Sequence, residues 1–225
     1  MTAYQLSETA ARTARILFEI KAVLFNAEKP FIFTSGSASP VYIDCRKLIS
    51  FPRARRAVIG MLTQQLYDNA GHECFDAVAG GETAGISYAA WVSDTMDLPM
   101  LYVRKQPKGF GRMAQIEGDL REGQRVLLVE DLASQGTSKV KFVEALRAAG
   151  AVVEHVGVVF HYGIYAKSDT TMQQLGVKLH GLCTWWDALA VARAQNYFDA
   201  KTLGEVEKYL HAPEEWSLAH GGRAA

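Results

Sequence analysis

Four runs of mainly aliphatic residues between positions 75 and 162 constrain the fold more than any other feature of the chain. They are FDAVAGG (75–81), PMLYVRK (99–105), RVLLVED (125–131) and VVEHVGVVFHY (152–162). Stretches of helical character, about 84–96 and 137–149, separate some of these runs. Aliphatic strands that alternate with helices are typical of a parallel sheet buried on both faces. We therefore predict an α/β fold with a parallel sheet flanked by helices.

The segments on either side of these runs predict further elements. Residues 7–25 have helical spacing behind a possible Ser7 cap, and FIFTSGSASPVYID (31–44) suggests a hairpin. A helix over 52–70, a strand over 177–184 and closing helices over 186–209 complete the prediction. Residues 105–124, with four glycines and a proline, show no steady period. A loop this long in a compact domain is usually functional or disordered, and its basic residues favour function.

Composition limits the classes of partner. The chain has 225 residues, is 49% hydrophobic and carries no net charge, with 24 basic and 24 acidic residues. Without a basic excess we expect neither a nucleic-acid nor a membrane partner, so a local positive cluster must hold any anionic ligand. The three cysteines lack C-x-x-C spacing, which favours free thiols. No apolar run approaches the roughly 18 residues of a membrane helix, and charged residues interrupt the N-terminus. We expect a soluble, cytoplasmic protein.

The strongest motif is VLLVEDLASQGTSKVKFVEALRAAGA (126–151). A buried strand ends in Glu130 and Asp131, and a small-residue turn, 133–137, leads into a helix. Backbone N–H groups at a helix N-terminus suit a phosphate. The acids repel phosphate, so they suit ribose hydroxyls, directly or through a divalent cation. The motif thus predicts a ribose 5-phosphate site. The alternative is an ordinary strand–turn–helix with solvated acids.

VLLVEDLASQGTS (126–138) resembles the signature with which type I phosphoribosyltransferases bind phosphoribosyl diphosphate (PRPP). The resemblance implies that Glu130 and Asp131 hold the ribose hydroxyls, that Asp131 is catalytic, and that both acids are candidate ligands of a Mg²⁺ ion carried mainly by PRPP. It also implies that the following residues wrap the 5-phosphate: Leu132, Ala133, Ser134, Gln135, Gly136, Thr137 and Ser138. The implied fold is the type I phosphoribosyltransferase sheet with a small hood. We expect one domain over 1–225, with the hood mainly in 1–50 and part of 160–225, and the PRPP-binding core at about 51–160.

YVRKQPKGFGR (102–112) looks like the R-K-x-x-K-x-x-G loop of orotate phosphoribosyltransferases. In that family the loop closes over the active site and its lysine touches the diphosphate. The resemblance implies that Arg104, Lys105 and Lys108 bind PRPP, with Lys105 catalytic. On the residues alone, a solvated charge run is an open alternative. AVAGGETAGISYAA (77–90) takes the place of the family's diphosphate loop, which implicates Thr83 and Ala84.

FTSGSASPVYID (33–44) is similar to a segment of orotate phosphoribosyltransferases that enzymes for purine bases lack. It implies that the pyrimidine is flanked by Thr34, Ser35, Gly36, Tyr42 and Ile43. From the phosphate-binding signature, Ser134 is a further candidate for orotate binding. A plain hairpin turn would explain the same glycine and proline. The main departure from the family is VVFHYGIY (158–165), where many members have an arginine for the orotate carboxylate. His161 is a candidate replacement, and a structural histidine is the alternative.

Together these resemblances imply an orotate phosphoribosyltransferase of de novo pyrimidine (UMP) biosynthesis. Its substrates would be PRPP and orotate, its products orotidine 5'-monophosphate and diphosphate, and its cofactor Mg²⁺. Family members are homodimers with shared active sites, and we expect the same here. Two alternatives stay open: a phosphoribosyltransferase for another base, and a PRPP-sensing regulator without catalysis.

Overall fold

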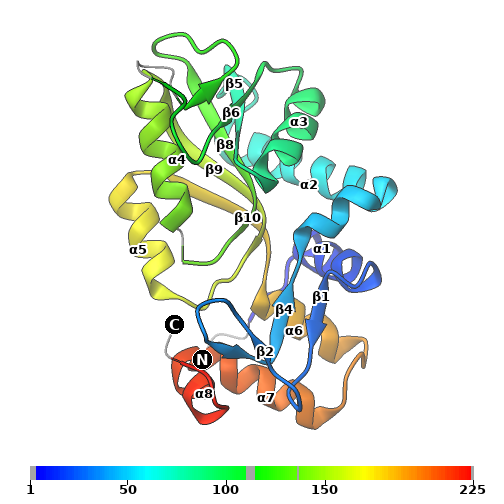
Figure 1. The fold of residues 1–225 in the computed structure, drawn as a ribbon. Helices are drawn as coiled ribbons and strands as arrows, with labels where there is room; N and C mark the ends of the chain where they lie inside the picture. The colour runs from blue at the N-terminus through cyan, green and yellow to red at the C-terminus, as the bar shows by residue number, and fades with distance from the viewer. Residues whose placement is uncertain (1–3, 110–114, 136, 224–225) are drawn as a thin grey trace. The chain divides into compact units, whose positions relative to one another are not determined.

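A computed structural model describes residues 4–109, 115–135 and 137–223 of the chain. The residues fall into two compact units (Figure 1). The first unit joins the two ends of the chain, Met1–Phe51 and Cys183–Ala225, and the second is Pro52–Leu182.

The second unit is built on a six-stranded sheet with the strand order β10-β9-β8-β5-β6-β7. Strand β5 pairs in parallel with both β6 and β8, and β8 pairs in parallel with β9. The short β7 runs antiparallel to β6. The strands are β5 (Ala77–Gly81), β6 (Met100–Val103), β7 (Ile116–Glu117), β8 (Arg125–Ala133), β9 (Val152–His161) and β10 (Lys178–Thr184). The predicted α/β fold with a mostly parallel sheet is confirmed.

Helices cover this sheet on both faces (Figure 1). They are α2 (Pro52–Ala70), α3 (Ala84–Met96), α4 (Thr137–Ala148) and α5 (Ala166–Leu175). Helices α2 and α3 pack on one face, and α4 and α5 on the other. All five residues of β5 are buried. At Gly80 an added Cβ would lie 2.3 Å from the carbonyl oxygen of Gly85, so the strand and α3 approach as closely as glycine allows. The central strands are therefore buried on both faces, which explains their uninterrupted aliphatic composition.

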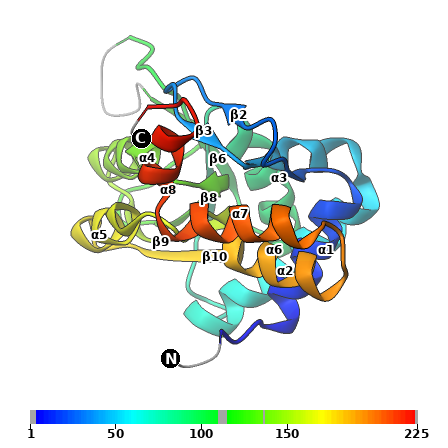
Figure 2. The ribbon, with the colours of Figure 1, turned by 90° about the horizontal axis from the view of Figure 1, so that it is seen from below.

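The first unit combines short strand pairs with helices from both ends of the chain. Its elements are α1 (Glu8–Glu19), β1 (Val23–Phe25), β2 (Phe31–Ile32), β3 (Ala38–Ser39), β4 (Val41–Ile43), the 3₁₀ helix η1 (Cys45–Ser50), α6 (Trp185–Ala194), α7 (Ala200–His211) and α8 (Pro213–Ala219). Ser7 caps α1 by accepting a 3.1 Å hydrogen bond from the Ala10 N–H, as predicted. Helix α7 lies beside α6 and leads into α8 (Figure 2).

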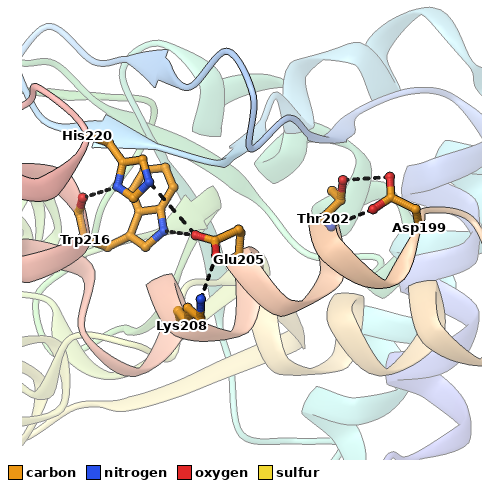
Figure 3. Close-up of polar contacts among 6 residues, drawn as sticks. All are labelled: Asp199, Thr202, Glu205, Lys208, Trp216 and His220. Carbon is orange, nitrogen blue, oxygen red and sulfur yellow. Dashed lines mark hydrogen bonds and ion pairs between the residues drawn. The ribbon is translucent and has the colours of Figure 1, made fainter.

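Glu205 joins the last two helices of the first unit (Figure 3). Its carboxylate accepts hydrogen bonds from Nε1 of Trp216, at 3.1 Å, and from Nζ of Lys208, at 2.7 Å. The Trp216 ring stacks on His220 with a centroid distance of 3.6 Å (Figure 3). Asp199 caps the start of α7 by accepting from the Thr202 N–H at 2.8 Å. The hydrogen bond between Glu205 and Trp216 joins α8 to α7, and the other contacts order each helix.

Several local predictions were wrong or incomplete. The helix predicted over 7–25 ends at Glu19, and β1 takes its last residues. In the segment 31–44, β2 pairs with β3, whereas β4 pairs with β1 instead of closing the predicted hairpin. Helix α5 was not predicted, and β7 lies in the stretch 105–124 that showed no period. Among the described residues no helix is long and apolar enough to cross a membrane.

Candidate active site

Glu130 and Asp131 lie near the carboxyl end of β8. Both are largely buried, with exposed fractions of 7% and 9%. Because β8 lies between β5 and β9, the two acids are near the middle of the sheet's edge. Open α/β sheets bind ligands outside the carboxyl ends of their strands. The acids therefore occupy the edge where a ligand is expected, and their contact with a ribose stays a prediction.

The Glu130 carboxylate is packed between two glycines and a lysine. Its Oε2 lies 3.6 Å from Nζ of Lys139, and its Oε1 has no hydrogen-bond partner in the described part of the chain. An added Cβ would lie 2.2 Å from Oε1 at Gly81 and 2.3 Å from it at Gly85. Burial raises the pKa of Glu130 to about 7, although the charge of Lys139 acts in the opposite direction. The site thus holds a buried carboxylate with one oxygen free to accept a hydrogen bond or a cation.

The phosphate loop predicted after β8 is anchored at its start. The Leu132 N–H donates to Oδ1 of Asp131 at 2.8 Å, and the Ala133 carbonyl accepts from the Tyr162 N–H at 2.8 Å. Both bonds fix the chain where it leaves the sheet.

The middle of the loop offers free donors. Within the described residues, the N–H groups of Ser134 and Gln135 donate to no protein group. Helix α4 begins at Thr137, so its positive end faces this turn. Gly136 and the side chains of Thr137 and Ser138 lie outside the described residues. Unpaired amides at a helix N-terminus can bind an anion.

The loop after β5 connects the acids to the basic segment. Glu82 follows Gly81, whose backbone lies against Glu130, and its Oε2 accepts from the Lys105 N–H at 2.7 Å. Thr83 is exposed at the start of α3, the Glu82–Thr83 peptide bond is cis, and Ala84 is the first residue of the helix. The structure therefore brings the acid pair, the predicted diphosphate loop and the start of the basic segment to one edge of the sheet.

The basic segment rises from the β6–β7 pair. Arg104 is held at its base, where its N–H donates to the Gln115 carbonyl at 2.8 Å and its Nη1 lies 3.4 Å from Oε1 of Glu117. Lys105 and Lys108 are exposed. The part of this loop at 110–114 lies outside the described residues. Two exposed ammonium groups close to the sheet edge are available to an anionic ligand.

The residues predicted to flank a pyrimidine belong to the first unit, apart from Ser134. Thr34, Ser35 and Gly36 form the turn between β2 and β3, where the Gly36 N–H donates to the Phe33 carbonyl at 2.8 Å. Gly36 has a φ of 87°, which favours glycine. Tyr42 and Ile43 lie on β4, with Tyr42 half-buried and Ile43 buried. Their role in binding stays a prediction.

His161 fits the structural alternative better than a carboxylate-binding role. Its Nε2 lies 3.2 Å from Oγ of Ser168, which is 1% exposed. Burial lowers the pKa of His161, although Asp169 acts against this shift. The ring faces a pocket of about 300 Å³ whose other lining residues are Asp169, Met172, Gln173, Val177 and Leu179. A neutral imidazole beside an acid is a poor partner for an orotate carboxylate.

Three residues at this edge were missed by the sequence analysis: Glu82, Gly85 and Lys139. The sequence could have shown that Lys139 is buried. It precedes Phe142, Val143 and Leu146 at helical spacing and so belongs to the buried face of α4. A lysine on such a face requires an opposite charge or an acceptor nearby.

Comparisons with known proteins agree with this geometry. The family model described as "Phosphoribosyl transferase domain" matches residues 52–179. The chain is 57% identical over 214 residues to the orotate phosphoribosyltransferase of Dinoroseobacter shibae, covering 95% of each sequence. The crystal structure of orotate phosphoribosyltransferase from Aeropyrum pernix matches with a TM-score of 0.69 and 30% identity, over 83% of this chain and 99% of that one. UMP synthase of Leishmania donovani matches with a TM-score of 0.73 and 28% identity, over 89% of this chain and 42% of that one.

The resemblance seen in the motifs thus extends over nearly the whole sequence, and the predicted type I phosphoribosyltransferase fold is confirmed. The chain belongs to the orotate phosphoribosyltransferase family.

Proposed function

We propose that this chain is a pentosyltransferase that moves the 5-phosphoribosyl group of PRPP to orotate, yielding orotidine 5'-monophosphate and diphosphate in pyrimidine biosynthesis. The observation that carries the proposal is the buried pair Glu130–Asp131 at the end of β8, followed directly by a loop with unpaired amides. Carboxylates beside a phosphate-binding turn suit a ribose 5-phosphate. The 57% identity to an orotate phosphoribosyltransferase supports orotate as the acceptor.

Binding of PRPP is assigned to the edge of the second unit. The loop after Asp131 would hold the 5-phosphate through backbone N–H groups, helped by the dipole of α4. Asp131 would accept hydrogen bonds from the ribose hydroxyls, and such charge-assisted bonds are the stronger kind. The orotate ring is assigned to the segment predicted for it, Thr34–Gly36 with Tyr42 and Ile43, and to Ser134.

Catalysis would depend on positioning and electrostatics. The bond from the anomeric carbon to the diphosphate oxygen breaks, and a bond from the same carbon to a ring nitrogen of orotate forms. The proton of that nitrogen passes to the departing diphosphate or to water. Negative charge grows on the departing diphosphate, where Lys105, Lys108 and Arg104 would stabilise it together with the backbone at Thr83 and Ala84. No protein nucleophile is required by this reaction.

The acids also fit a bound Mg²⁺ ion. Magnesium prefers carboxylate and phosphate oxygens and is often bound through one or two carboxylates plus the phosphates of a substrate. Oε1 of Glu130 is buried without a partner in the described part of the chain, while those residues contain no cluster of three or more His, Cys, Asp or Glu suited to a metal. We therefore assign the ion mainly to PRPP, with Glu130 and Asp131 as candidate protein ligands. When bound, it would neutralise charge on the diphosphate.

We also propose that the protein is a homodimer in which Lys105 reaches the site of the partner subunit. Mixing Lys105→Ala with Asp131→Asn subunits tests this arrangement, because one site of each heterodimer would inherit both changes and the other neither. Recovery of activity on mixing supports shared sites. No recovery, with subunit exchange shown to occur, contradicts them. A cytoplasmic location is proposed as well, because Cys45, Cys74 and Cys183 are present as thiols and not as disulfides.

The activity is tested by following the loss of orotate absorbance in the presence of PRPP and Mg²⁺, with uracil, adenine and hypoxanthine as competing acceptors. We expect orotate to be the preferred base. Faster turnover of a purine would indicate a phosphoribosyltransferase for another base. Tight PRPP binding without turnover of any base would instead indicate the PRPP-sensing regulator.

A further inference from the structure

Lys139 is a buried lysine in the first turn of α4, where a hydrophobic residue would normally pack. Its exposed fraction is 5%, and it shares the buried stripe of the helix with Phe142 and Val143. Burying an ammonium group is costly unless it is paired and hydrogen-bonded. The groups that contact the Lys139 ammonium therefore indicate its role.

One partner is the backbone of the phosphate loop. Nζ of Lys139 donates to the Leu132 carbonyl at 2.5 Å, seven residues earlier in the chain. The N–H of the same residue donates to Oδ1 of Asp131 at 2.8 Å. Both polar backbone groups of Leu132 are thus held by charged side chains, and the turn that follows begins from a fixed peptide.

A second partner is Glu130, whose Oε2 lies 3.6 Å from Nζ of Lys139. Both side chains are nearly enclosed, since both residues are buried. Interactions between charges are stronger where water is excluded. Lys139 therefore holds the carboxylate in place behind Asp131 and offsets part of its charge.

Packing alone does not require this lysine. Replacing a buried ion pair by apolar residues of similar volume is often neutral or stabilising. A methionine would fill a similar volume, but it would leave the Leu132 carbonyl and Glu130 without their common partner. We therefore attribute the lysine at this position to its contacts with the Leu132 carbonyl and Glu130, which need a positive charge at the end of a long side chain.

We propose that Lys139 is a positioning residue for PRPP, which fixes Leu132 at the start of the phosphate loop and the Glu130 carboxylate. The proposal rests on the assignment of PRPP to this edge. Lys139 does not touch the substrate and acts through Leu132 and Glu130. Its loss displaces the phosphate loop relative to the acids, and displacements of this kind have large effects on reactions that depend on orientation.

Three variants test the proposal: Lys139→Met removes the charge, Lys139→Arg keeps it, and Lys141→Met is the matched control. Lys141 lies on the same helix, two residues away, and is exposed. We expect Lys139→Met to raise the Kd and KM for PRPP about 10- to 100-fold, with a change of less than about threefold in the KM for orotate. Lys139→Arg should recover part of the PRPP affinity, and Lys141→Met should leave both constants unchanged.

Calorimetric titration with PRPP and with ribose 5-phosphate measures binding without turnover, and thermal unfolding reports stability separately. If orotate is not turned over by the parent protein, the proposed function fails while these binding measurements still decide the role of Lys139. A lowered Tm with PRPP affinity within twofold of the parent would overturn the proposal. If Lys139→Met does not fold, Lys139→Arg decides the question: a loss confined to PRPP supports positioning, and an equal loss for both substrates, or none, overturns it.

Discussion

The buried His180 and the half-buried His155 form a pair that should make the second unit less stable in mild acid. The rings stack with a centroid distance of 5.1 Å, and Nδ1 of His155 lies 2.8 Å from Nε2 of His180. One ring must donate and the other must accept, so the bond requires at least one neutral imidazole. His180 is 3% exposed, and Cys74 and Phe75 contact His155 from the other side.

Burial lowers the pKa of His180 to about 4, and the positive charges of His155 and Lys178 act in the same direction. Burial also lowers the pKa of His155, with Glu154 opposing the shift and Lys178 adding to it. A histidine of the unfolded chain has a pKa of about 6.5. Below that pH the histidines are protonated in the unfolded state, whereas the folded pair stays neutral. The free energy of unfolding therefore falls as the pH falls from about 6.5 to 4.

The shift of His180 alone would reduce the free energy of unfolding by about 2 kcal/mol between pH 7 and pH 5. Since His155 is half-buried and solvent screens part of the effect, we expect about 1–2 kcal/mol. His180→Gln should remove this loss, whereas His72→Gln, at an exposed position, should not. Urea unfolding at both pH values measures the difference, and NMR titration of the His180 ring checks the shift. A pH dependence in His180→Gln equal to that of the parent would refute the reasoning.

Three further predictions concern the site. Asp131→Asn should weaken PRPP binding by about 1.5–3 kcal/mol, because a charge-assisted acceptor is lost; calorimetry measures it, and unchanged affinity would contradict a role at the ribose. Lys105→Ala should lower kcat by roughly 10²–10³ with a smaller change in KM, since the charge it meets grows as the bond breaks; unaltered kcat would mark the segment as a solvated loop. Gly85→Ala should destabilise the protein by about 1–3 kcal/mol, because its Cβ would lie 2.3 Å from Oε1 of Glu130 and 2.7 Å from the Val129 carbonyl. Gly60→Ala, with nothing within 4 Å, is its control for thermal unfolding and should not destabilise.

The sheet could be predicted because its signal is local. Strand β8 reads as one aliphatic run, and six consecutive residues from Val126 to Asp131 are buried. Helix α5 gave no such signal, because of its ten residues only Ser168 and Met172 are buried. Strand β7 has two residues, too few for an alternation to be seen. The pairing of β4 with β1 depends on contacts between distant residues, which a turn-based reading of 31–44 could not supply.

The candidate site also contains residues that local sequence could predict and residues that it could not. Glu130 and Asp131 were predictable because a strand, two acids and a small-residue turn follow one another in the sequence. Glu82 was not, since its hydrogen bond to the Lys105 N–H joins residues that are 23 positions apart. The need for glycine at Gly81 and Gly85 also emerges only in the folded structure. An added Cβ would collide with Oε1 of Glu130 at both positions, with the Phe142 ring at Gly81 and with the Val129 carbonyl at Gly85.

At this edge of the sheet one lysine is buried and two are exposed, and the two kinds have different roles. This difference explains how a chain with no net charge can be suited to a polyanionic substrate. Below the surface, Lys139 is matched with Glu130, so it can fix the loop without creating a general attraction for anions. At the surface, Lys105 and Lys108 are exposed, and water screens them until a bound substrate excludes it. Removing the buried lysine should therefore impair substrate binding, whereas removing Lys105 should impair the chemical step. Variants of Lys139 and Lys105 therefore distinguish two contributions: the positioning of the groups that bind PRPP, and the stabilisation of the departing diphosphate.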